Sequence, residues 1–172
     1  MATVHNAATS SFLARVILCS ALSFSLNLVW EISHVGFYTI WREADGLRIA
    51  WSVFHCTLGD VLIALAGFAL TAIVLWRADW PLSRPWTGGL ILVIAATAFT
   101  AWSEWYNVYR AGAWGYAKSM PLIFGIGLTP LLQWLVLPPV MVVAYRKLWP
   151  ALCGWQKLRS PFAVNNLTRS KK

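Results

Sequence analysis

The sequence predicts an all-α fold, an integral membrane four-helix up-and-down bundle. Only 12% of the 172 residues are charged, whereas soluble domains average about 25%. Four stretches have the length needed to cross a bilayer, which takes about 20 mostly apolar residues. They cover about residues 11–32, 50–76, 87–108 and 121–145. A chain of this length is expected to form one membrane domain, residues 1–147, followed by a basic tail, residues 148–172.

Residues that begin or end helices separate the four stretches. Thr9 and Ser10 precede the first stretch and are typical of helix starts. That stretch contains no A-x-A-like cleavage site, which favours a retained anchor over a signal peptide. Pro81 and Pro85 mark the turn after the second stretch. Because the connections are short, neighbouring helices are expected to be antiparallel. The third and fourth stretches are separated by Gly112, Gly115 and Pro121.

The fourth stretch contains several prolines, which are expected to loosen its helix. Pro130 and the pair at 138–139 lack the N–H groups that an uninterrupted helix uses. Carbonyl groups that are freed inside a membrane must find donors within the bundle. Thr129 and Gln133 share a helix face and are expected to donate to one of these carbonyls.

Positive charge predicts the direction in which the chain crosses the membrane. With both termini in the cytoplasm, ten of the 14 Lys and Arg lie inside. The positive-inside rule therefore favours an N-in, C-in arrangement in a bacterial inner membrane. All 12 tryptophans except Trp134 fall near span ends, which predicts two aromatic belts. The positive residues on the outer side are Arg42, Arg48, Arg110 and Lys118.

The tail carries aromatic residues between its basic ones, which predicts binding to anionic lipid headgroups. These aromatic residues are Trp149, Trp155 and Phe162. Nucleic acid is not an expected partner, because nothing else in the chain forms a reading module. The three cysteines are scattered and form no CxxC motif, which argues against a disulfide framework and a zinc site.

Polar side chains within the apolar stretches mark the candidate site. A charge in hydrocarbon costs at least roughly 2.5–3.5 kcal/mol on insertion scales, so such residues are functional candidates. Asp60 lies deepest, where water at the interface cannot solvate it. Asp60, Glu104 and His55 are the expected catalytic residues, all toward the outer face. The expected substrate-binding residues are Glu31, Asn107, His34 and Gln133.

Helical spacing predicts which of these side chains share a face, because residues three or four apart are neighbours. Asn27, Glu31 and His34 form one polar stripe. Another comprises Thr97, Thr100, Glu104 and Asn107. A run of small or polar residues on the second span predicts close helix packing, with Asp60 pointing into the bundle. That run is Ser52, Cys56, Asp60, Ala64, Gly67 and Thr71.

Three kinds of function agree with these residues. The first is acid–base chemistry on, or binding of, a lipid-like molecule in an outer-leaflet pocket. The second is a bound metal or haem, with Glu31-x-x-His34 as the nearest motif and His34 and His55 as axial candidates. The third is an accessory or assembly subunit of a larger membrane complex, with a structural polar cluster. No cofactor and no metal ligand is assigned from the sequence.

Several short motifs resemble an uncharacterised group of small, Trp-rich bacterial multi-pass membrane proteins. Residues 104–134 are also similar to the pattern in carotenoid-modifying membrane hydratases and cyclases. That resemblance implies acid–base chemistry on a polyene and favours an isoprenoid ligand. The chain is much shorter than those enzymes, and His55 and Asp60 have no counterpart in their pattern. The motifs are Trp30-Glu31, His55-Cys56-x-x-Gly59-Asp60, Ser103-Glu104-Trp105-x-Asn107, Gly112-x-Trp114-x-Tyr116 and Pro130-Leu131-Leu132-Gln133-Trp134.

Overall fold

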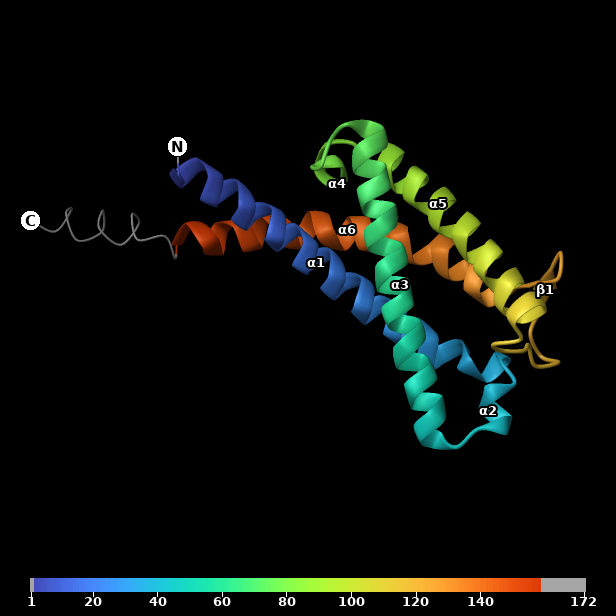
Figure 1. Ribbon diagram of the computed structural model, residues 1–172. Helices are drawn as coiled ribbons and strands as arrows, with labels where there is room; N and C mark the ends of the chain where they lie inside the picture. The colour runs from blue at the N-terminus through green and yellow to red at the C-terminus, as the bar shows by residue number, and fades with distance from the viewer. Residues whose placement is uncertain (1, 159–172) are drawn as a thin grey trace, which may run out of the picture.

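The computed structural model describes residues 2–158, with side chains from Phe12 to Leu152, and confirms the all-α four-helix bundle. Its long helices are α1 (Ala2–His34), α3 (Gly46–Leu75), α5 (Pro85–Trp105) and α6 (Leu128–Leu158) (Figure 1). Within the described residues, four helical segments are long and apolar enough to cross a membrane. These segments are Phe12–Phe37, Gly46–Leu75, Pro85–Ala111 and Leu128–Leu152.

The four helices form a closed ring of neighbours. α1 packs against α3 and α6, and α5 packs against the same two helices. The beginning of α1 and the end of α6 lie together at one end of the bundle (Figure 1). Arg15 of α1 lies 5.1 Å from the ring of Trp149 in α6, and Tyr145 stacks on Trp149 at 5.7 Å. Both ends of the described chain are therefore on the same side of the bundle.

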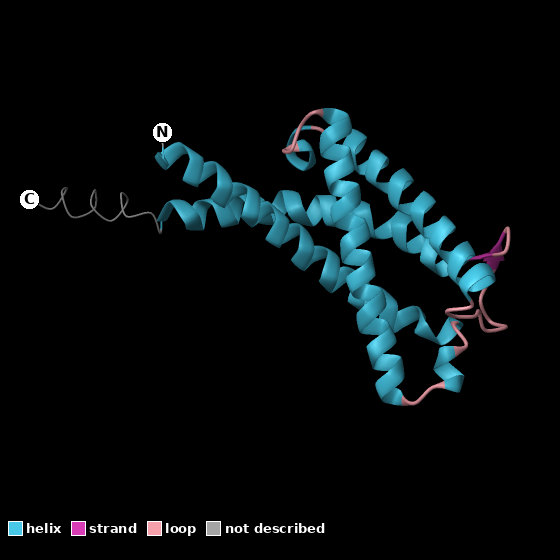
Figure 2. Cartoon of the chain, in the orientation of Figure 1, coloured by secondary structure: helices cyan, strands magenta, loops and turns pink. Residues whose placement is uncertain are grey.

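Short elements connect the helices at the two ends. η1 (Val35–Phe37) and α2 (Ile40–Glu43) follow α1, and α4 (Trp80–Ser83) lies between α3 and α5. The π-helical turn η2 (Tyr106–Ala111) extends α5. β1 (Leu122–Ile123) and β2 (Ile126–Gly127) form an antiparallel hairpin, the one strand region in the part of the chain drawn in colour in Figure 2.

The fourth span begins at Leu128 and not at about residue 121 as predicted, because the residues before Leu128 form the hairpin. Its turn is formed by Phe124 and Gly125, with φ of 50° and 82°. Two consecutive positive φ angles match the twist of a tight hairpin and are incompatible with a right-handed helix. The hydrophobicity of this segment suggested a span, but its backbone pairs with itself instead.

The predicted run of small residues on α3 is at a helix interface. Ala64, Gly67 and Thr71 are all buried, and Gly67 faces Leu92 of α5 so closely that a Cβ would lie 2.5 Å from its Cδ1. Close approach through small residues is a general feature of spanning helices, because van der Waals packing is their main attraction in lipid. The sequence prediction for this face is confirmed.

Two tryptophans outside mid-span pack inside the protein rather than in an aromatic belt. Trp80 of α4 is fully buried, with its Nε1 donating to the carbonyl oxygen of Phe68 at 3.3 Å. Trp149 is also buried, under Arg15. The belt interpretation is therefore wrong for these two. It fits Trp76 and Trp86, which are exposed at the same end of the bundle.

The prolines do not interrupt α6. Pro130 is the third residue of the helix, where its missing N–H removes no internal hydrogen bond. Gln133 donates to two side chains, and Thr129 bonds to His34 and Met120, so the prediction that they serve freed carbonyls is wrong. α6 extends into the predicted tail as far as Leu158. The remainder, residues 159–172, lies outside the described residues.

Candidate functional site

A cavity of about 410 Å³ lies near the end of the bundle that carries α2. α1, α3 and α5 form most of its wall, together with residues from η1, α2 and the loop after α5. Glu31, His34 and Glu104 line it and are buried, whereas Trp51 and His55 line it and are exposed. The carboxyl groups are therefore on its floor, and Trp51 and His55 are at its rim.

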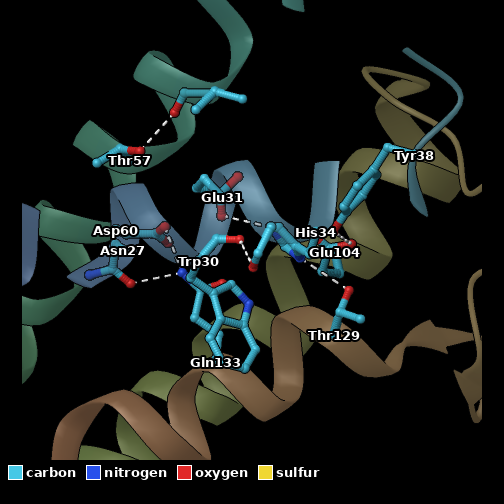
Figure 3. Close-up of polar contacts among 12 residues, drawn as sticks. Asn27, Trp30, Glu31, His34, Tyr38, Thr57, Asp60, Glu104, Thr129 and Gln133 are labelled. Atoms are coloured by element: carbon cyan, nitrogen blue, oxygen red, sulfur yellow. Dashed lines mark hydrogen bonds and ion pairs between the residues drawn. The ribbon is translucent and has the colours of Figure 1, made fainter. Parts of the chain in front are cut away.

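Asp60 is held in place by an amide from another helix. Gln133 Nε2 donates to Asp60 Oδ2 and to Asn27 Oδ1, both at 2.8 Å (Figure 3). Asn27 in turn donates to the carbonyl and hydroxyl oxygens of Ser23, at 2.8 and 2.9 Å. Asn27, Ser23 and Gln133 are almost completely buried. This network connects α1, α3 and α6 in the interior of the bundle.

Glu31 stands between Asp60 and His34. Its Oε1 lies 3.0 Å from His34 Nε2, and the other ring nitrogen of His34 lies 3.1 Å from Thr129 Oγ1 (Figure 3). The carboxyl groups of Asp60 and Glu31 line the same cavity. Glu31 and His34 are thus in direct hydrogen-bond contact, and Asp60 lines the same cavity.

Glu104 accepts hydrogen bonds from two loops. The hydroxyl of Tyr116 donates to its Oε2 at 2.6 Å, and that of Tyr38 reaches both carboxyl oxygens at 3.4 Å. The same loops are paired by backbone bonds, Thr39 N to Gly115 O at 2.9 Å and Ala117 N to Phe37 O at 2.8 Å. Glu104 therefore fastens two connecting segments over the cavity.

Both tyrosines remain protonated donors at ordinary pH. Burial raises the pKa of the Tyr116 phenol, and its hydrogen bond to Glu104 raises it further. Burial also raises the pKa of the Tyr38 phenol, followed by the nearby charge of Glu104. Ionising either phenol would place a second negative charge beside the carboxylate.

Five of the seven residues predicted from the sequence line the cavity. They are Glu31, His34, His55, Asp60 and Glu104. The structure places Gln133 and Asn107 elsewhere. Gln133 lies behind Asp60, which it holds. Asn107 donates to the carbonyl and hydroxyl oxygens of Ser103, at 2.8 and 3.2 Å, one turn earlier in its own helix.

The two histidines have different surroundings. His34 is buried and bonded to Glu31. His55 is exposed and stacks on Trp51, with ring centroids 6.4 Å apart. His34 is therefore the histidine in contact with a carboxyl group, whereas the sequence had predicted His55 as the catalytic histidine.

Three polar residues at or next to the site were not predicted from the sequence: Tyr38, Tyr116 and Thr129. Tyr38 and Tyr116 lie in connecting segments 78 positions apart, and Glu104 brings them together. No periodicity relates them. Thr129 was expected to serve the backbone of its own helix, and only the packing of α1 against α6 places it beside His34.

Within residues 2–158, no group of three His, Cys, Asp or Glu side chains is arranged to hold a metal ion. The nearest motif, Glu31 and His34, forms a hydrogen-bonded pair. Comparisons with known protein families, with curated proteins and with solved structures found no match to this chain.

Proposed function

We propose that this protein binds a lipid-like molecule in the cavity and transfers a proton to or from it. The observation that carries the proposal is the convergence of Glu31, Asp60 and Glu104 from three spans on one cavity. A concave apolar site with a few convergent polar groups is the usual form of a ligand-binding site. Carboxyl groups inside a membrane domain are costly, which supports a role beyond packing.

Each polar group has a part in the proposed transfer. Asp60 and Glu31 are the carboxyl groups that give a proton to a basic atom of the ligand, or accept one from it. His34 exchanges a proton with Glu31 across their 3.0 Å contact. Gln133 orients Asp60, and Glu104 holds the loops above the cavity. The resemblance of residues 104–134 to carotenoid-modifying enzymes makes an isoprenoid one member of the ligand class.

The proposal includes a location, a bacterial inner membrane with both termini in the cytoplasm. Four spans keep the two chain ends on one side, and the distribution of positive charge favours the cytoplasm for that side. In this orientation the cavity is near the outer leaflet, where a lipid-like molecule enters from the bilayer.

Filling the cavity tests whether it is a binding site. Gly59 lines the cavity, and a Cβ at this position would have no atom within 4 Å. Gly59→Leu should therefore place a side chain in the cavity without moving the backbone. Gly46→Leu is the matched control, because Gly46 is exposed on the same helix and equally free of neighbours.

The measurement is mass spectrometry of the small molecules that co-purify with each variant in mild detergent. We expect the wild type and Gly46→Leu to retain a lipid-like molecule that Gly59→Leu has lost. An identical set of molecules in all three preparations would contradict the proposed binding site. The same molecule is then loaded into the wild type and into the variants Asp60→Asn and Glu31→Gln. Each variant should convert the molecule more slowly than the wild type, because each lacks one of the two carboxyl groups.

A second candidate is a non-catalytic accessory subunit, favoured by the buried bonds that join Asn27, Gln133 and Asp60. If the only role of Asp60 is to accept the bond from Gln133, Asp60→Asn should accumulate in the membrane and keep the function of the protein, because an asparagine oxygen still accepts that bond. The proposed function predicts that this variant accumulates normally but slows the conversion of the bound molecule.

A further inference from the structure

The cavity is lined by acidic side chains and, among its described lining residues, by no Lys or Arg. These acidic side chains are Glu31, Asp60 and Glu104. The nearest cationic candidates are the two histidines, of which His34 already pairs with Glu31. A ligand group that carries negative charge would approach three carboxyl groups with no fixed positive charge beside it, which is unfavourable in a site of low polarity.

Several hydrogen-bond donors around the cavity are already used. Gln133 donates to Asn27 and Asp60, and the hydroxyls of Tyr38 and Tyr116 donate to Glu104. Each carboxyl group has about four acceptor positions. The contacts formed by Asp60 and Glu31 occupy only some of these positions. The site therefore has carboxyl acceptors to spare, and its unpartnered buried donors among the described residues are the Trp114 indole N–H and the Thr100 hydroxyl.

Thr100 supplies an independent sign that a polar partner is missing. It lines the cavity and is only 7% exposed, and its Oγ1 has no hydrogen-bond partner among the described residues. A buried hydroxyl group without a partner costs about 1–3 kcal/mol, so such groups are rare in folded proteins. A ligand with a polar group at this depth would satisfy it.

Aromatic side chains also line the cavity. Tyr38, Trp51 and Trp114 line the cavity together with the carboxyl groups. The faces of such rings attract cations, and the attraction increases when the cation is desolvated. Carboxylates and aromatic faces together are suited to an ammonium group.

We propose that the ligand is a single-chain amphiphile with a protonated amine, which lies among Asp60, Glu31 and Thr100. Its hydrocarbon chain leaves the cavity past the exposed rim formed by Trp51 and His55. This inference rests on the binding part of the proposed function, that a lipid-like molecule occupies this cavity. It adds the chemistry of the head, a primary ammonium group with three donors, and excludes phosphate headgroups, which bring negative charge and extra acceptors.

Three probes with the same chain separate the possibilities: dodecylamine, dodecanol and dodecyl phosphate. Each is titrated into the full-length protein in an uncharged maltoside detergent at pH 7, and the thermal unfolding midpoint gives the apparent affinity. We expect dodecylamine to bind at least about tenfold more tightly than dodecanol, because its charge meets a buried carboxylate. We expect no binding of dodecyl phosphate.

Variants locate the binding. Gly59→Leu should abolish the response to dodecylamine, and Gly46→Leu should retain it. Asp60→Asn should weaken dodecylamine binding at least about tenfold and leave dodecanol binding nearly unchanged. Glu31→Gln is the second variant for the same test if Asp60→Asn does not fold. If Gly59→Leu still responds to dodecylamine, the amine binds to the micelle or to another surface of the protein. That result would contradict the inference.

The outcomes distinguish the inference from the proposed function. If dodecanol or dodecyl phosphate binds as tightly as dodecylamine, and Gly59→Leu removes that binding, the ammonium proposal is wrong and the lipid site stands. If none of the three probes gives a response that depends on Gly59, both proposals are contradicted.

Discussion

At the scale of single residues, the interior of the bundle depends on one amide. Gln133 is 2% exposed and uses the same nitrogen to serve Asn27 on α1 and Asp60 on α3. An amide nitrogen has two hydrogens, so both contacts can be made at full strength. Asparagine is the other neutral side chain with two amide donors, and it is one methylene shorter.

Replacing this amide should destabilise the bundle. Gln133→Leu keeps the side-chain volume but leaves acceptors on Asn27 and Asp60 without a donor, at about 1–3 kcal/mol for a buried group. The measurement is the free energy of unfolding in mixed detergent micelles. Leu135→Ala is the control, since Leu135 is 49% exposed on the same helix and should change stability much less. A Gln133→Leu variant as stable as the control would contradict the proposed network.

Tyr116 should give the protein a distinct loss of stability at alkaline pH. Its pKa is raised in the folded protein, first by burial and then by Glu104, above the value of about 10 for an unfolded chain. The folded state therefore holds this proton more tightly than the unfolded state does. The corresponding stabilisation is complete below about pH 10 and is lost as pH rises through the folded pKa.

The measurement is the thermal unfolding midpoint between pH 7 and 11 for the wild type and Tyr116→Phe. At pH 8 the variant should be less stable by about 1–2 kcal/mol, because its hydrogen bond to Glu104 is missing. Above about pH 10 the difference should shrink. Tyr106→Phe, with an exposed ring on η2, should behave as the wild type. A constant difference across the whole range would refute the assignment.

At the scale of elements, the sequence predicted contacts that helical periodicity determines. Asn27, Glu31 and His34 recur every three or four residues, and all three are buried. Ala64, Gly67 and Thr71 follow the same rule on α3. A helix has one repeat, so a stripe of like residues identifies the face that packs inward.

Contacts that depend on connecting segments were not predictable in this way. Tyr38 and Tyr116 meet because two loops pair with each other, and Trp80 is buried because α4 folds back onto α5. Belt and core tryptophans are both apolar and both occur near span ends, so position alone cannot separate them. The hairpin at 122–127 was missed because its residues are as hydrophobic as a span.

The contact between α4 and α5 gives a prediction with a neighbouring control. A Cβ at Gly88 would clash with the buried ring of Trp80, whereas a Cβ at Gly89 would meet Val142 at an ordinary 3.9 Å. Gly88→Ala should therefore cost about 1–3 kcal/mol through overpacking. Gly89→Ala should leave the unfolding free energy unchanged or slightly higher, because alanine favours a helix. Equal stability of the two variants would show that Trp80 can move freely.

At the scale of the whole molecule, the two ends of the bundle are built differently. The end near the chain termini is closed by aromatic packing around Trp80 and Trp149. The opposite end carries the cavity, the carboxyl groups and the paired loops. Asp60 reaches that cavity from the interior of α3, and the ring of four helices brings Glu31 and Glu104 to it. The function proposed here therefore belongs to one side of the membrane.

The direction of the chain decides which side that is, and cysteine labelling can measure it. In a background where the native cysteines are replaced by alanine, Ser119→Cys places a thiol in the exposed loop after α5, and Ser83→Cys places one at α4. A membrane-impermeant maleimide added to right-side-out bacterial vesicles should label position 119 at once. Position 83 should react only after the membrane is opened, because the proposed N-in, C-in orientation places it on the cytoplasmic side.

Inside-out vesicles provide the control, since they should reverse both results without any change in the protein. The reverse pattern in right-side-out vesicles would mean that the cavity faces the cytoplasm. Such an outcome would leave the four-helix bundle and the carboxyl pair untouched, because neither depends on orientation. It would instead require the ligand to come from the inner leaflet, and the four outer positive charges at Arg42, Arg48, Arg110 and Lys118 would then contact cytoplasmic anionic lipid.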